Sequence, residues 1–247
     1  MQDAADAALN YARQGFSATQ AADMIAPAMN LAAGTATDLA TVTGGVGNAM
    51  KIFADQGLEA ESAANMLAKA QAQANTTVTD LFEAMSTAGP MLDSVGWSFK
   101  DLAVVTDVFG DAGISGSEGA TALKTGLARL ASPAADGAAA MKKLNLQFFD
   151  STGKMDDLQT MQKKLHESFA GLNDQERMSA AAAIFGKNQM AKWMTLINAT
   201  RTGQQRIRHR FCRSSGVLQS FRILGKGLRC RIDQRHPLRH LVLAENS

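Results

Sequence analysis

The chain has 247 residues, enough for one large domain or for one domain with an appended segment. Aromatic residues make up 6%, with 1 Tyr, 2 Trp and 4 Pro. A β-sandwich or barrel would need more aromatic and β-branched residues and more turns, so this profile favours helices. We expect no membrane span and no secretory signal, because there is neither a run of about 18 apolar residues nor a basic then apolar N-terminus.

Charge divides the chain into two parts. Residues 1–200 carry 14 Lys and Arg against 21 Asp and Glu, a balance of −7, whereas residues 201–247 carry 11 against 2, a balance of +9. Alanine accounts for 43 of the first 200 residues, and one alanine follows. All 13 Met precede residue 200, while both Cys follow it. We therefore expect a helical core region over residues 1–200 and a separate basic segment over residues 201–247.

In the first part, apolar residues recur every three or four positions, the spacing of amphipathic helices. We interpret the Met and aromatic side chains in these stripes as core residues. The sequence thus predicts an all-α fold, a compact array of short to medium helices. The stripes comprise Ala21, Met24, Ile25, Ala28 and Ala32; Ala63, Met66, Leu67, Ala70 and Ala74; Phe99, Leu102, Val105 and Phe109; Leu123, Leu127 and Leu130; Leu158, Met161, Leu165, Phe169 and Leu172; and Met190, Trp193, Met194 and Ile197.

Connections between these helices share a glycine–hydrophobic–serine pattern. Glycine can adopt the left-handed conformation that ends a helix, and the apolar residue packs back on the last turn. Serine suits the N-cap of the next helix. The pattern occurs at Gly15-Phe16-Ser17, Gly96-Trp97-Ser98 and Gly113-Ile114-Ser115, and with an acid in third place at Gly57-Leu58-Glu59.

Three of these glycines, Gly15, Gly57 and Gly96, follow one another along the chain at intervals of 42 and 39 residues. Two interpretations remain open: a helical-hairpin repeat of about 40 residues, or independent capping chemistry at each site. Between the later helices, residues 146–154 break the helical pattern and predict a short β-hairpin or extended turn.

Motifs that would carry catalysis are incomplete. His166 is the single His of the first 200 residues, which contain no Cys, so neither a Cys–His pair nor a multi-His metal site can form there. His166-Glu167 lacks the second His of a zinc-protease helix. The acidic pair Asp156-Asp157 is simplest as a negatively charged helix start. We therefore expect no enzyme and assign no catalytic, cofactor-binding or metal-binding residue.

The basic segment supports an alternative function, nucleic-acid binding, through arginines that would neutralise phosphates. These are Arg206, Arg208, Arg210, Arg213, Arg222, Arg229, Arg231, Arg235 and Arg239. A zinc site from Cys212, Cys230, His236 and His240 is disfavoured, because the gap between the two cysteines is too long for a common zinc knuckle. We interpret residues 201–247 as a disordered or out-of-frame end, since alanine codons in GC-rich DNA read one base out commonly become arginine codons.

Several segments resemble one known family, the tape-measure proteins of phage tails. Residues 113–123, which read Gly-Ile-Ser-Gly-Ser-Glu-Gly-Ala-Thr-Ala-Leu, continue to Leu127-Ala128-Arg129-Leu130-Ala131-Ser132-Pro133 and resemble a signature of that family. The resemblance extends through residues 85–90, 149–155, 169–172 and 183–187 and covers roughly residues 5–198. At positions 119–120 the chain reads Gly-Ala where the family often reads Ala-Gly.

The resemblance implies a structural protein that lies in the lumen of the tail tube, templates tube assembly and sets tail length. It implies tail-tube subunits and tail-assembly chaperones as partners, several copies per tail, and synthesis in the bacterial cytoplasm. Even a fully helical chain of this size would span only about 370 Å. We therefore expect this chain to be the compact core region of such a protein, a fragment without the long helical remainder.

Overall fold

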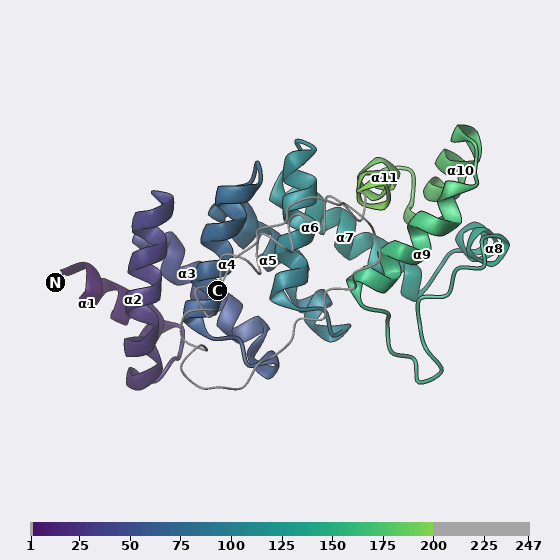
Figure 1. Ribbon diagram of the computed structural model, residues 1–247. Coiled ribbons are helices and arrows are strands. Elements are labelled where there is room, and N and C mark those ends of the chain that lie inside the picture. Colours follow the sequence, from purple (N-terminus) through teal and green to yellow (C-terminus); the bar gives the residue numbers. More distant parts are fainter. Residues whose placement is uncertain (1, 200–247) are drawn as a thin grey trace, which may run out of the picture. The chain divides into compact units, whose positions relative to one another are not determined.

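The computed structural model describes residues 2–199, and Figure 1 shows their helices in chain order. These residues form α-helices and one 3-10 helix, η1, and they contain no β-strand, so the all-α prediction is confirmed. The basic segment predicted at residues 201–247 lies outside the described residues. The helices are α1 (Gln2–Arg13), α2 (Ala18–Thr35), α3 (Leu39–Ile52), η1 (Ala54–Gln56), α4 (Ala60–Gln73), α5 (Val78–Ser94), α6 (Phe99–Asp111), α7 (Gly116–Ala131), α8 (Ala135–Lys143), α9 (Leu158–Ala170), α10 (Asp174–Phe185) and α11 (Met190–Asn198).

The predicted connections have the expected geometry. Gly15, Gly96 and Gly113 have φ angles of 87°, 78° and 75°, in the left-handed region. Ser17, Ser98 and Ser115 are the N-caps of α2, α6 and α7, and each hydroxyl oxygen accepts a hydrogen bond from a backbone N–H three residues later. Local chemistry therefore sets where these helices begin.

Two connections differ from this pattern. Gly57 also has a positive φ, 64°, but it ends the short η1 rather than an α-helix, and Glu59 makes no side-chain cap for α4. Helix α2 ends at Ala36, which has a φ of 53°. Because alanine rarely adopts this conformation, no pattern in the sequence predicts it.

Helices α1 to α7 pack in a regular order. Each contacts the helix two places along the chain, so that α1 meets α3, α2 meets α4, α3 meets α5, α4 meets α6 and α5 meets α7. This is the arrangement that a helical-hairpin repeat produces. The order changes after α7, because α10 packs against α7, α8 and α11, and α11 also contacts α6 and α9.

Most residues of the predicted stripes are buried, and the partly exposed ones are Ile25, Ala32, Met66, Ala74, Leu172, Met190 and Met194. Helix α6 is enclosed most completely, since every residue from Leu102 to Gly110 is buried. An α-helix that is apolar on nearly all sides is typical of the interior of a helical protein. Helix α6 therefore lies at the centre of the packed unit.

The segment predicted as a hairpin forms one isolated antiparallel bridge, between Phe149 and Met155. The Asp150 carboxylate accepts hydrogen bonds from the backbone N–H groups of Thr152 and Lys154, which closes a tight turn. The chain enters α9 immediately afterwards, so the two extended arms are too short for strands.

Candidate functional site

The family-like segment at residues 113–123 begins α7 against the start of α5. The N–H of Gly116 points to the Asp80 carboxylate at 3.4 Å, and a Cβ atom at Gly116 would lie 2.1 Å from the Asp80 carbonyl oxygen. Only glycine permits so close an approach. Burial opposes ionisation of Asp80, but hydrogen bonds from Thr77 and Gly116 outweigh it and lower the pKa of its carboxyl group.

The same segment contacts α6 one turn later. A Cβ atom at Gly119 would lie 2.4 Å from the Phe109 ring. Glycine at this position, where the family often has alanine, therefore lets α7 lie against a buried aromatic side chain of α6. Gly116 and Gly119 of the family-like segment thus permit close helix packing, whereas Gly113 follows α6 with a positive φ.

Two further family-like segments, residues 127–133 and 183–187, meet in space. The Arg129 guanidinium donates hydrogen bonds to the carbonyl oxygens of Ile184 and Ala183, at 3.1 and 3.4 Å. These carbonyl groups end α10, where a positive charge is favourable. Gly186 follows with a φ of 88° and lies against the same guanidinium group.

Trp193 packs α11 against α7 and the end of α10. Its ring is fully buried and stacks on Phe185, with the ring centroids 4.1 Å apart. Its indole N–H donates to the Ala122 carbonyl oxygen at 2.9 Å. A Cβ atom at Gly126 would lie 2.2 Å from the indole ring, so α7 has a glycine where the tryptophan rests on it. Sequence reasoning placed Trp193 in the core but gave no partner for it.

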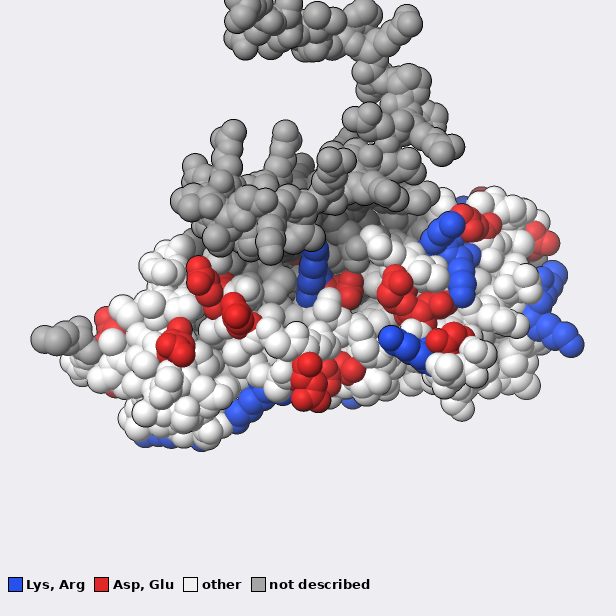
Figure 2. Space-filling view, turned by 60° about the horizontal axis from the view of Figure 1, so that its bottom comes forward, with Lys and Arg blue, Asp and Glu red and all other residues white. Residues whose placement is uncertain are grey.

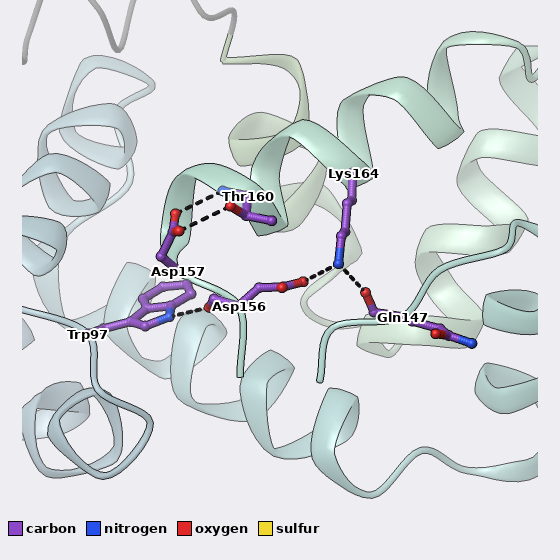
Figure 3. A network of polar contacts seen from close by, with 6 residues as sticks. All are labelled: Trp97, Gln147, Asp156, Asp157, Thr160 and Lys164. Atoms are coloured by element: carbon purple, nitrogen blue, oxygen red, sulfur yellow. Dashed lines mark hydrogen bonds and ion pairs between the residues drawn. The ribbon is translucent and has the colours of Figure 1, made fainter. Parts of the chain in front are cut away.

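A second polar network joins α9 to the connection between α5 and α6 (Figure 3). The indole N–H of Trp97 donates to the Asp156 carbonyl oxygen at 2.9 Å. Lys164 Nζ lies 2.6 Å from the Asp156 carboxylate and 2.8 Å from the Gln147 carbonyl oxygen. Asp157 is the N-cap of α9 and accepts from the Thr160 N–H. The acidic pair therefore starts a helix, as the sequence predicted.

Asp107 is an acidic side chain in the interior of α6. It is 0% exposed, and neither carboxylate oxygen has a hydrogen-bond partner among the described residues. Burial, with a smaller contribution from the charge of Asp111, raises the pKa of Asp107 from 3.8 to about 7. Sequence reasoning missed this residue because an aspartate in a helix usually faces solvent.

A hollow of about 460 Å³ lies between α3, α5 and the start of α7. Glu83 is the charged residue among those that line it, so the hollow offers hydrogen-bonding groups but no acid–base pair for proton transfer. Its lining consists of Ala40, Thr41, Gly44, Gly45, Asn48, Thr79, Phe82, Glu83, Ser86, Thr87 and Ser117.

Charge is dispersed over the face drawn in Figure 2, where acidic and basic side chains stand among wide uncharged areas. Over residues 2–199 the balance is −7. A net negative surface does not attract phosphate. The arginines of the nucleic-acid alternative, and the Cys and His residues of the disfavoured zinc site, lie outside the described residues.

Within residues 2–199, no three His, Cys, Asp or Glu side chains gather as a metal site would require. His166, on α9, places Nδ1 3.1 Å from the Ile197 carbonyl oxygen. No helix in this part of the chain is long and apolar enough to cross a membrane.

A comparison with known protein families matches the part of the chain that contains the packed family-like segments. The profile of the phage-related minor tail protein family matches residues 1–186, which include α1 to α10. The chain belongs to the phage-related minor tail protein family. The family match therefore covers the regularly packed helices α1 to α7 (the stack), the glycine contacts of α7 and the contact between Arg129 and α10.

Two curated relatives are named as tape measure proteins. The tape measure protein of Pneumococcus phage Dp-1 is 26% identical over 198 residues, which are 80% of this chain and 17% of that protein. The probable tape measure protein of Escherichia phage P2 is 27% identical over 124 residues, 49% of this chain and 15% of that protein. The chain thus spans about one sixth of the length of these relatives. No solved structure matches it.

Proposed function

We propose that this chain is a structural phage-tail protein and supplies the packed helical region of a tape measure protein. The observation that carries the proposal is the similarity to the Dp-1 tape measure protein across 80% of the chain. The contacts support it, because the family-like segments are used for helix packing, at Gly116 against Asp80 and at Arg129 against the end of α10.

We further propose that this region organises the tail by packing rather than by spanning its length. The longest described helix, α2, has 18 residues and rises only about 27 Å. Successive helices lie against one another instead of extending end to end. Under this proposal, an extended ruler is supplied by other sequence, and residues 2–199 provide a folded unit attached to it.

The proposed location is the lumen of the tail, with assembly in the bacterial cytoplasm. The proposed partners are tail-tube subunits, tail-assembly chaperones and further copies of the chain. We propose no catalytic role for the described residues. Acidic side chains among them have structural roles, since Asp157 caps α9 and Asp156 forms an ion pair with Lys164.

The proposal is tested by removing residues 2–199 in frame from the gene, in the phage or prophage that carries it. We expect few tails, or tails of irregular length, in electron micrographs, and we expect the unaltered gene supplied in trans to restore them. Peptides from residues 2–199 should also occur in purified wild-type tails by mass spectrometry. Tails of normal number and length after the deletion would overturn the proposal.

A matched pair of variants separates folding from mere presence of the chain. Gly116→Val drives a side chain into the Asp80 backbone, whereas Gly34→Val, in α2, meets no atom within 4 Å. We expect tail defects with Gly116→Val and normal tails with Gly34→Val. Equal tail yields for the two variants would contradict a role for the packed unit.

A further inference from the structure

Helix α6 has a buried aspartate, Asp107, whose charge no described contact compensates. Asp107 is completely buried, and its two oxygens have no hydrogen-bond partner among the described residues. Gly110 and Asp111, three and four residues later, contact Asn75, with the Asn75 N–H donating to the Asp111 carboxylate at 3.1 Å. Since residues three and four apart share a helix face, Asp107 faces the connection between α4 and α5.

The helices packed against α6 are α4, α5, α7 and α11. Asp111, on α6 itself, is the one described charge that acts on Asp107. It repels a second negative charge. The ionisable side chains on the four neighbouring helices are Glu61 and Lys69 of α4, Asp80, Glu83 and Asp93 of α5, Glu118, Lys124 and Arg129 of α7, and Lys192 of α11.

The basic side chains among these do not act on the charge of Asp107. Arg129 bonds to the carbonyl groups that end α10, and Lys192 lies 3.8 Å from Glu118. Lys124 is exposed. Ionised Asp107 therefore has no described cation to compensate its charge, and a buried carboxylate without compensation is costly.

We propose that Asp107 is a proton-controlled switch, which keeps α6 packed against its neighbours while the carboxyl group is protonated and loosens that packing when the proton is lost. The inference goes beyond the proposed tail role and does not depend on it. The proton leaves to solvent when α6 opens, and no other reactant is needed.

The direction follows from proton linkage. The pKa of Asp107 is raised in the folded chain to about 7, above the ordinary value of 3.8 that an open chain restores. Between these values the closed form holds a proton that the open form releases. The contribution to stability is therefore full below about pH 4, is lost progressively as the pH rises to 7, and changes little above it.

Amide hydrogen exchange of the full chain tests the switch. From pH 5 to pH 8, after correction for the intrinsic exchange rate, we expect the opening equilibrium constant of α6 to rise on the order of 100-fold. Asp107→Asn, which mimics the protonated acid, should abolish the rise. Asp23→Asn, the same change at an exposed position of α2, should retain it. An equal rise in all three proteins would overturn the proposal.

A second measurement decides the matter if Asp107→Asn does not fold. The carboxyl carbon of Asp107 in the ¹³C-labelled full chain reports its protonation directly by NMR. A titration midpoint above pH 6 supports the switch. A midpoint below pH 6 means that the acid is ionised in the closed chain under ordinary conditions, which refutes it.

Discussion

Helices α1 to α7 and helices α8 to α11 are held together in different ways. Within the first group, several hydrogen bonds that involve side chains join residues 33 to 41 positions apart, about the length of two helices with their connections. Examples run from Asn10 to Thr43, from Gln56 to Trp97 and from Gly116 to Asp80. The bonds that tie the second group to the first join residues 54 to 71 apart and come from Trp97, Arg129 and Trp193.

This difference indicates where each group is sensitive to mutation. Helices of the stack approach one another closely at glycines, such as Gly116 against Asp80 and Gly119 against Phe109, whereas the side-chain hydrogen bonds that attach the second group come from a few large side chains. Substitutions that enlarge a residue should therefore destabilise the stack most. Substitutions that shorten a side chain should most weaken the contacts that hold helices α9, α10 and α11 on the stack.

The largest effect is expected for Trp193→Ala. The ring is fully buried, stacks on Phe185 and bonds to the Ala122 carbonyl group, so its loss leaves a cavity and an unpaired acceptor. Such a truncation costs about 4 kcal/mol of unfolding free energy. Urea unfolding followed by circular dichroism measures it. Trp193→Phe keeps most of the packing and should cost clearly less; equal losses for the two variants would mean that packing is not what holds α11.

The stack is tested next by Gly116→Ala. The added methyl group would lie 2.1, 2.6 and 2.9 Å from three backbone atoms of Asp80, so α7 must move away from α5. We expect a loss of about 2–3 kcal/mol, the usual effect of overpacking. Gly34→Ala, also in a helix but with no atom within 4 Å, should leave the protein as stable or slightly more stable. A stable Gly116→Ala protein would contradict the close approach.

The two groups also differ in how much the sequence could predict. In the stack, signals are local: Ser98 and Ser115 lie directly before α6 and α7, and Gly96 and Gly113 lie two residues after the ends of α5 and α6. Such patterns reveal helix boundaries because capping involves residues only a few positions apart. The all-α fold and most buried stripes followed from them.

The contacts of Trp193 and Arg129 and the burial of Asp107 could not be predicted in this way. Each depends on which helices become neighbours, and an indole or a guanidinium group bonded to a backbone carbonyl leaves no pattern in the sequence of its partner. Ala36 is a similar case, because alanine rarely has the positive φ that it adopts at the end of α2. The sequence thus revealed the family-like segments that form these contacts, but it did not reveal which of the segments lie side by side.

A smaller effect tests the local signals by themselves. Gly96 and Gly171 both have open space where a side chain would be added, but Gly96 has a φ of 78° and Gly171 a φ of −86°. Valine at Gly96 is strained by the backbone conformation alone and should cost about 1–2 kcal/mol. Valine at Gly171 should change the unfolding free energy by less than about 0.5 kcal/mol. Similar melting temperatures for the two variants would remove the left-handed assignment at Gly96.

The smallest expected effect concerns the ion pair that holds the start of α9. Lys164 is partly exposed and lies 2.6 Å from Asp156, whose side chain is 17% exposed, whereas its neighbour Lys163 lies 3.9 Å from Glu167 with both side chains largely in solvent. Because water and salt screen exposed pairs, Lys164→Met should cost about 0.5–1 kcal/mol and Lys163→Met almost nothing. The difference should shrink in 1 M salt, where charges are screened within about 3 Å. If the two variants unfold at the same urea concentration in low salt, the Trp97 indole holds this segment without help from the lysine.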